Sequence, residues 1–229
     1  MEIDKIQCLD HGYVRLVDSM GSDLSVVRAA RVSYDAEWRA GENEGSDKRL
    51  IHYLAKNNHS TPFEAVEFQF EVKAPIFVVR QWHRHRTWSY NELSGRYKEL
   101  PEEFYIPDVK QITTQHSDNK QMRTDEENPH APVIQARMRE KNASAFREYN
   151  RLLQLGCPRE LARSVLPVST YTHMFAKVNL LNLIKFIKLR NHDHAQYEIR
   201  VYAHAMQQMA RTVVPESISA WVGKVDFDI

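Results

Sequence analysis

The sequence predicts an α+β fold in one domain over residues 1–229, with an antiparallel or mixed sheet flanked by long helices. Strict alternation of apolar and polar side chains over residues 66–74 is typical of a strand with one buried face. Residues 132–155 and 193–213 instead carry apolar side chains at helical spacing, over lengths greater than those of ordinary strands. The sequence contains no internal repeat and no linker that would divide the chain.

Local patterns assign the elements in the first third of the chain. Residues 13–18 are rich in β-forming residues and lie between two glycines, as a short strand does. Residues 24–33 and 47–58 space their apolar side chains as amphipathic helices do, and a polar loop separates them. Residues of types that cap helices precede both: Ser22 or Asp23, and Ser46.

The segment HSTPFE, residues 59–64, matches a capping box. Thr61 and Glu64 have the spacing at which two side chains bond the first N–H groups of a helix, and Pro62 suits the first helical position. Because helix N-termini also attract anions, the segment can serve both structure and ligand binding.

A helix over residues 76–85 leads Gln81 and Arg84 into the polar segment RHRTWSYNELSGRY, residues 84–97. This segment is too polar for a core strand and has no apolar stripe, which predicts a loop. Arginine suits phosphate or carboxylate groups, while serine, glycine and asparagine let backbone N–H groups approach an anion closely. The segment indicates a pocket for a small phosphorylated molecule; a solvated arginine-rich loop is the alternative.

The second half of the chain is a polar excursion followed by regular elements. Residues 101–132 are irregular, as in a surface insertion or an interface loop. The predicted elements that follow are a long helix (132–155), a short helix (158–167), a strand (168–178) and two helices (180–190 and 193–213).

Composition limits the function classes and the compartment. With 31 basic and 30 acidic residues, the formal net charge of +1 lacks the positive excess that drives nonspecific nucleic-acid binding. Two cysteines, Cys8 and Cys157, are too few for a disulfide framework. No apolar run approaches the roughly 20 residues of a membrane helix, and the first ten residues lack a secretion signal. These features predict a cytoplasmic protein that binds neither membranes nor nucleic acid.

The polar segment also resembles a family signature. RHRTWSYNELSGRY matches RHRxxSxNExSxRY, the pattern of the flavin-dependent thymidylate synthases, at every fixed position. The matched residues are Arg84, His85, Arg86, Ser89, Asn91, Glu92, Ser94, Arg96 and Tyr97. Further segments similar to the family are HSTPFE, PRELARSVLP (158–167) and FIKLRNHDHAQYEI (186–199).

The resemblance implies FAD-dependent conversion of dUMP to dTMP, with 5,10-methylenetetrahydrofolate as carbon donor and NADPH as reductant. It also implies a homotetramer whose active sites are shared between subunits. The sequence has no P-loop and no dinucleotide-binding fingerprint, so the flavin assignment rests on the resemblance alone.

The same match implies roles for individual residues. Arg190 is expected to act in catalysis by stabilising negative charge that develops on the uracil ring. The expected substrate-binding residues are Gln81, Arg84, Glu92, Ser94, Gly95, Arg96, Arg163 and Arg190. The expected flavin-binding residues are Thr61, Glu64, Arg84, His85, Arg86, Glu92, Asn179 and His194.

One departure from the family concerns the flavin contacts. The family often has an arginine two positions after the residue that matches Asn179, and a polar residue four positions further on. This chain has Leu181 and Lys185 there. Part of the contact to the adenine or phosphate end of the flavin therefore differs, with Lys185 or Asn182 as the candidate replacement.

Other kinds of chemistry compete with this interpretation. Ser94 and Cys157 could act as nucleophiles, but no base is visibly paired with Ser94, and a structural role is favoured for Cys157. Arginines interleaved with aromatic residues could bind single-stranded RNA, and the histidine-aspartate pair at 192–193 could belong to a metal-dependent phosphohydrolase. We expect no bound metal, because two histidine pairs lack supporting ligands: His83 with His85, and His192 with His194.

Overall fold

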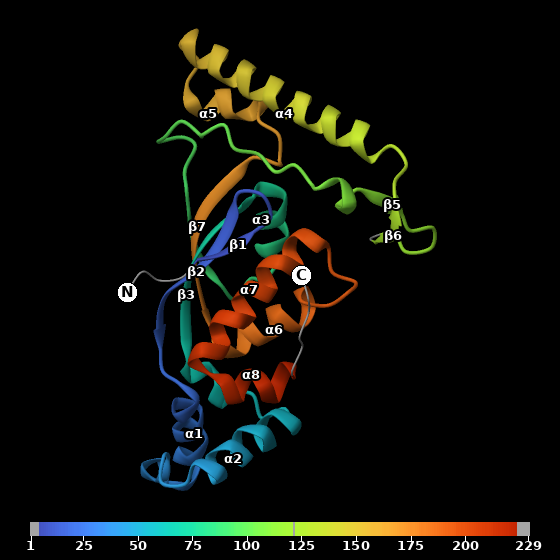
Figure 1. Cartoon of the computed structure of the whole chain (residues 1–229). Coiled ribbons are helices and arrows are strands. Elements are labelled where there is room, and N and C mark those ends of the chain that lie inside the picture. Colours follow the sequence, from blue (N-terminus) through green and yellow to red (C-terminus); the bar gives the residue numbers. More distant parts are fainter. Residues whose placement is uncertain (1–4, 121, 224–229) are drawn as a thin grey trace.

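The computed structural model describes residues 5–120 and 122–223. At its centre is a five-stranded sheet with the strand order β1-β2-β3-β7-β4 (Figure 1). Every pairing in this sheet is antiparallel, so the predicted α+β class is confirmed. The strands are β1 (Lys5–Cys8), β2 (Gly12–Met20), β3 (Glu67–Pro75), β4 (Ser89–Glu92) and β7 (Tyr171–Asn179).

Helices cover one side of the sheet and both of its ends (Figure 1). α6, α7 and α8 lie along one side, α1 and α2 lie beyond one end, and α4 and α5 run across the other. The alternating residues Phe68, Phe70 and Val72 of β3 belong to the same buried cluster as Phe186 of α6 and Tyr202 of α7. The helices are α1 (Asp23–Arg31), α2 (Glu44–Lys56), α3 (Ile76–Trp82), α4 (Ala131–Gln154), α5 (Arg159–Ala162), α6 (Leu180–Arg190), α7 (Tyr197–Val213) and α8 (Pro215–Val222).

Most predicted elements are present, with shifted ends. The strand predicted at 13–18 extends to both sides as β2, and the long helix predicted at 132–155 is α4. The helix predicted from residue 193 begins at Tyr197, because residues 192–195 form a turn in which Ala195 N–H bonds the His192 carbonyl at 2.8 Å. β1, α8 and the hairpin of β5 (Thr113–Gln115) and β6 (Arg123–Glu127) were not predicted.

For two segments, the predicted type of secondary structure is wrong. The segment 84–97 is not a loop throughout, since β4 pairs with β7 at the edge of the sheet, where a strand can keep polar, exposed side chains. HSTPFE is not an α-helix N-terminus but the 3₁₀ helix η3 (Thr61–Ala65), which has Ser60 as N-cap and no side-chain capping bond. Strand β3 begins two residues after η3, which leaves no room for an α-helix.

The cap of α2 is also corrected. Asn43, not Ser46, is its N-cap, and the Asn43 side chain accepts a hydrogen bond from Ser46 N at 2.9 Å. Ser22 is the N-cap of α1, as predicted. Asp23, the alternative, accepts hydrogen bonds at the start of α8 instead, from the backbone of Glu216 and Ser217.

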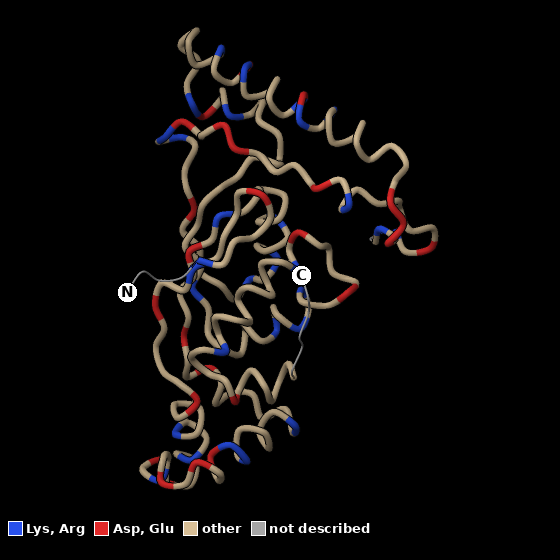
Figure 2. The backbone as a smooth tube through the Cα atoms, in the orientation of Figure 1, with Lys and Arg blue, Asp and Glu red and all other residues tan. Residues whose placement is uncertain are grey.

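Acidic and basic residues are mixed along the described chain (Figure 2). No helix within the described ranges is long and apolar enough to cross a membrane. The sheet face opposite the core carries a polar cluster around Glu71, which is 7% exposed. Tyr13 O–H donates to Glu71 Oε1 at 2.8 Å, His173 Nε2 lies 2.8 Å from the same oxygen, and Arg15 pairs with the other.

The Glu71 cluster joins β2, β3 and β7 through one carboxylate. Burial raises the pKa of Glu71, but the hydrogen bonds from Tyr13, His173 and Arg15 outweigh burial and lower this pKa to about 2. The folded state therefore holds the carboxylate ionised well below the usual pKa of 4.5.

We predict that Glu71→Gln lowers the free energy of unfolding by about 2–3 kcal/mol at neutral pH, because it leaves Arg15 partly buried without its anion. In the unmodified protein this stabilisation is complete above pH 4.5 and is lost as the pH falls from there toward about 2. Urea denaturation over a pH series measures both effects. Glu67→Gln, which removes one long pair with the exposed Lys177 at 3.7 Å, is the control, and an equal loss there would contradict the prediction.

Candidate functional site

The first group of predicted residues lies where the ends of α3 and α6 meet. Arg190, the last residue of α6, donates from Nε to His85 Nε2 at 3.0 Å. A ring nitrogen that accepts a hydrogen bond carries no proton, so His85 is the neutral tautomer protonated on Nδ1. Burial and, after it, the charge of Arg190 lower the pKa of His85 to about 4. Burial and the charge of Arg84 lower the pKa of Arg190, which places Arg84 in the same group.

The second group is a tight turn packed against the end of α5. Tyr97 N–H bonds the Ser94 carbonyl at 3.0 Å, and Arg96 N–H donates to Ser94 Oγ at 3.3 Å. A side chain at Gly95 would place its Cβ 3.2 Å from Cδ of Arg163, so a larger residue would require that arginine to shift by a few tenths of an ångström. The segments 84–97 and 158–167, far apart in sequence, thus meet as the phosphate-site prediction requires.

Glu92 lies next to this turn on β4. Thr172 of β7 donates from its hydroxyl to Glu92 Oε1 at 2.7 Å, which fixes one carboxylate oxygen. Within the described residues no ion pair forms at Glu92, although its neighbours in sequence are rich in arginine. The second oxygen therefore remains an acceptor at the border of the turn.

The third group lies at the start of α6. Asn179 is the N-cap of α6, and its side chain accepts from Asn182 N at 3.0 Å. η3, which carries the exposed Thr61 and Glu64, is held beside this cap because Leu180 N–H bonds the Val66 carbonyl at 2.8 Å.

These groups do not all converge within one chain. Glu92 is opposite Met174 on β7, and Asn179 lies five residues further along the strand, a separation of about 17 Å. Asn179 and Arg190 lie at opposite ends of α6, about 16 Å apart. The third group is thus distant from the other two.

The side chains around these groups fit an anionic ligand such as the pyrophosphate of FAD. Arg84, Arg86 and Arg163 are exposed, and in the described part of the chain none of them forms an ion pair. The two remaining residues considered for the flavin site differ in exposure. His194 is exposed, with its ring centroid 5.0 Å from that of His192, whereas Leu181 is buried in the core. A buried leucine cannot contact the cofactor, whereas Lys185 is exposed on the same helix.

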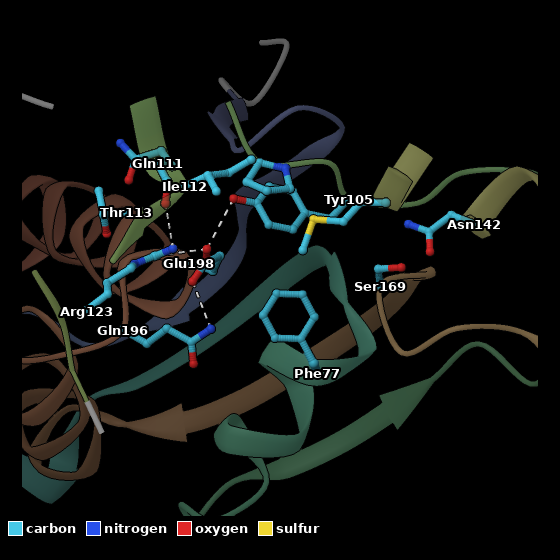
Figure 3. Close-up of a pocket in the computed structure, with 12 residues that line it drawn as sticks. Phe77, Tyr105, Gln111, Ile112, Thr113, Arg123, Asn142, Ser169, Gln196 and Glu198 are labelled. Atoms are coloured by element: carbon cyan, nitrogen blue, oxygen red, sulfur yellow. Dashed lines mark hydrogen bonds and ion pairs between the residues drawn. The ribbon is translucent and has the colours of Figure 1, made fainter. Parts of the chain in front are cut away.

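Sequence reasoning missed a cavity of about 390 Å³ between α3, α4 and the polar excursion (Figure 3). Phe77, Tyr105 and Ile112 form its apolar walls, and none of the predicted site residues lines it. Its polar residues include Gln196 and Glu198, which lie within the family-like segment 186–199 but were assigned no role. Among the described residues, no group of three or more metal-binding side chains converges.

Comparisons with known proteins assign the chain to a family. A family model described as "thymidylate synthase complementing protein" matches residues 15–216. The chain belongs to the flavin-dependent thymidylate synthase family. The enzyme of that name from Thermotoga neapolitana is 46% identical over 218 residues, covering 95% of this chain and 94% of the relative. The one from Ehrlichia ruminantium (strain Gardel) is 45% identical over 215 residues, covering 93% and 71%.

Solved structures with the same fold are also similar to this chain. The UMP/dUMP methylase PolB from Streptomyces cacaoi, bound with 5-Br dUMP, superposes with a TM-score of 0.83 at 39% identity. The match covers 94% of this chain and 97% of PolB. The same protein bound with 5-Br UMP gives a TM-score of 0.82.

We predict that His85 stays neutral well below the usual histidine pKa of 6.5, and that its folded state takes up the proton only near pH 4. Since the unfolded chain binds that proton first, stability falls as the pH is lowered from 6.5 to about 4. His85→Gln, which keeps an acceptor for Arg190 but does not titrate, should reduce this slope, whereas His59→Gln at an exposed position is the control. NMR titration of the imidazole nitrogens is the direct measurement, and an ordinary pKa with the proton on Nε2 would contradict the prediction.

Proposed function

We propose that this protein converts dUMP to dTMP, with FAD as cofactor, 5,10-methylenetetrahydrofolate as carbon donor and NADPH as reductant. The observation that carries the proposal is the glycine turn at Ser94–Arg96 packed against Arg163, in a chain whose family and fold are those of thymidylate synthases. The PolB structure bound with 5-Br dUMP supports a pyrimidine nucleotide as ligand.

The turn and its neighbours supply a phosphate site. Backbone N–H groups at Ser94 and Gly95, together with Arg96 and Arg163, bind the phosphate of dUMP. The pair of Arg96 with Glu160 is long, at 3.6 Å, and exposed, so Arg96 can release it at little cost. Gly95 lets Arg163 pack closely against the turn, since a Cβ there would require the Arg163 side chain to shift slightly.

Arg190 is the proposed catalytic residue. Its guanidinium stays charged and stabilises negative charge on the uracil ring, while neutral His85 holds its Nε without neutralising that charge. Gln81, Arg84 and Glu92 complete the nucleotide contacts. Ser94 is a binding residue, because no base bonds its hydroxyl in the described part of the chain.

The proposed flavin contacts come from two parts of the chain. The polar segment 84–97 contributes Arg84, His85, Arg86 and Glu92. The second part is η3 with the two ends of α6, which contributes Thr61, Glu64, Asn179 and His194. FAD, when bound, supplies the redox chemistry of the reaction. Lys185 replaces the missing arginine contact, since Asn182 is already occupied by the Asn179 cap.

We also propose a homotetramer whose active sites combine residues of different subunits, with 1–229 as a single thymidylate synthase domain in the cytoplasm. The separation of the third group from the others supports shared sites. Tyr34, Trp38 and Tyr97 are 87%, 68% and 80% exposed, which supplies apolar surface for subunit contacts. The two cysteines are unpaired thiols, as in reducing compartments.

UMP is the second candidate substrate, because PolB is a UMP/dUMP methylase with both analogue complexes. The higher identity to thymidylate synthases favours dUMP. The test is an absorbance spectrum of the purified protein followed by turnover with each nucleotide. Flavin bands that bleach with NADPH and shift with dUMP, and formation of dTMP, are the expected results. A protein that retains no flavin after FAD is added and excess removed would refute the proposal.

We predict that Arg163→Gln raises KM for dUMP by about 10- to 100-fold, as expected for loss of one charged phosphate contact. FAD binding should change little, because the flavin contacts lie elsewhere. Arg159→Gln, at the start of the preceding helix α5, removes an exposed pair with Glu99 at 3.6 Å and is the matched control. Steady-state kinetics measure both, and similar KM values in the two variants would remove Arg163 from the site.

We predict that Lys185→Ala weakens FAD binding about 3- to 10-fold, as for loss of one exposed charged contact, with a smaller effect on KM for dUMP. Lys188→Ala, on the same helix beside Trp221, is the control. Fluorescence titration of apoprotein with FAD measures the two affinities. Equal affinity of Lys185→Ala and the unmodified protein would exclude Lys185 as the replacement contact.

A further inference from the structure

Gln81 belongs to a chain of hydrogen bonds that begins at a buried carboxylate. Glu198, at the start of α7, is 4% exposed. Its Oε1 accepts from Arg123 Nη2 at 2.9 Å and from Tyr105 O–H at 3.2 Å (Figure 3). Its Oε2 accepts from Gln196 Nε2 at 2.8 Å, and Gln196 Oε1 in turn accepts from Gln81 Nε2.

The carboxylate dictates the orientation of both amides. An ionised carboxylate only accepts hydrogen bonds, so Gln196 must turn its NH₂ group toward Glu198 and its carbonyl toward Gln81. Gln81 must then turn its own NH₂ group toward Gln196. Its carbonyl oxygen, Oε1, has no hydrogen-bond partner among the described residues and can accept from a ligand.

Two groups keep Glu198 in this acceptor role. The Arg123 guanidinium has only donors and pairs with Glu198 Oε1 at 2.9 Å, so this oxygen must accept. Burial and then Glu198 itself raise the pKa of Tyr105 well above its usual value, so the phenol remains a donor. Arg123 also donates from Nη1 to the Gln111 carbonyl at 3.0 Å, which ties the β5–β6 hairpin to the same point.

We propose that Glu198 is a positioning residue that, through Gln196, makes Gln81 present an acceptor to the nucleotide. We call Glu198, Gln196 and Gln81 the amide relay. The proposal rests on the proposed function, in which Gln81 contacts dUMP. It also gives the polar excursion a role, because that segment contributes Arg123 and Tyr105 and so anchors the relay.

The chemistry of dUMP narrows the contact. Doubly ionised dUMP has only two hydrogen-bond donors, N3–H of the uracil and the 3′-hydroxyl, because its other polar atoms are acceptors. A carbonyl at Gln81 therefore pairs with one of these two groups. An NH₂ group in the same place would face a donor and repel it.

A single substitution, Glu198→Gln, should reverse the direction of the hydrogen bonds along the amide relay. In Glu198→Gln, Arg123 and Tyr105 still require an acceptor, so the new amide turns its NH₂ group toward Gln196. Gln196 and Gln81 then reverse, and Gln81 presents NH₂ to the nucleotide. We expect KM for dUMP to rise about tenfold, the cost of one lost hydrogen bond with a mismatched partner, with FAD binding unchanged.

A double variant restores the original direction. In Gln196→Glu with Glu198→Gln, the carboxylate at 196 accepts from both neighbours, and Gln81 again presents its carbonyl. KM should return to within about twofold of the unmodified value, although Gln196→Glu alone places two carboxylates side by side. Gln208→Glu, the same change at an exposed position of α7, is the control. A double variant no better than Glu198→Gln overturns the proposal, as does a Glu198→Gln variant with unchanged KM.

A second measurement does not depend on the folding of the relay variants. In the unmodified protein, dUMP analogues methylated at N3 or lacking the 3′-hydroxyl are compared with dUMP by calorimetry. One analogue should lose affinity, and that loss should vanish in Gln81→Ala. Losses that persist unchanged in Gln81→Ala overturn the relay. Failure of the unmodified protein to make dTMP would instead refute the proposed function.

Discussion

The antiparallel ladder between β3 and β7 determines where the candidate site residues lie. It pairs nine residues of each strand, from Glu67 with Asn179 to Pro75 with Tyr171. Each strand passes directly into a helix, β3 into α3 and β7 into α6, so the two helices begin at opposite ends of the ladder. α6 then runs back toward the end of α3, and this return brings Arg190 to His85. A shift in register would separate them.

The sequence was most informative where one pattern had one physical cause. Alternation identified β3 because one face of that strand is buried, and the signature included the turn at Ser94–Arg96, in which the buried Gly95 packs against Arg163. β4 was missed because an edge strand need not bury either face. HSTPFE misled because its residue types suit an α-helix, whereas the nearby start of β3 limits it to a 3₁₀ turn.

The role of Gln196 and Glu198 lay beyond sequence reasoning for a different reason. A glutamine and a glutamate at the start of a helix are predicted to be exposed, unless another segment of the chain packs over them. Glu198 is covered by Arg123, 75 residues away in the chain, in a segment whose composition predicted a surface insertion or an interface loop. Charged residues in the same structure differ in this respect. Glu71 has three partners, whereas Arg84, Arg86 and Arg163, which are proposed to bind ligands, form no ion pair within the described residues.

The uninterrupted junction of β7 and α6 has an evolutionary consequence. Thr172, which holds Glu92, lies on the strand, Asn179 caps the helix, and Arg190 ends it, with no loop to absorb a change in length. One inserted residue in β7 would exchange its two faces, and one in α6 would rotate Arg190 by about 100° around the helix axis. Insertions and deletions during divergence should therefore accumulate in the excursion at 101–130 and at the chain ends. The segment 171–190 should keep its length even where its residues change.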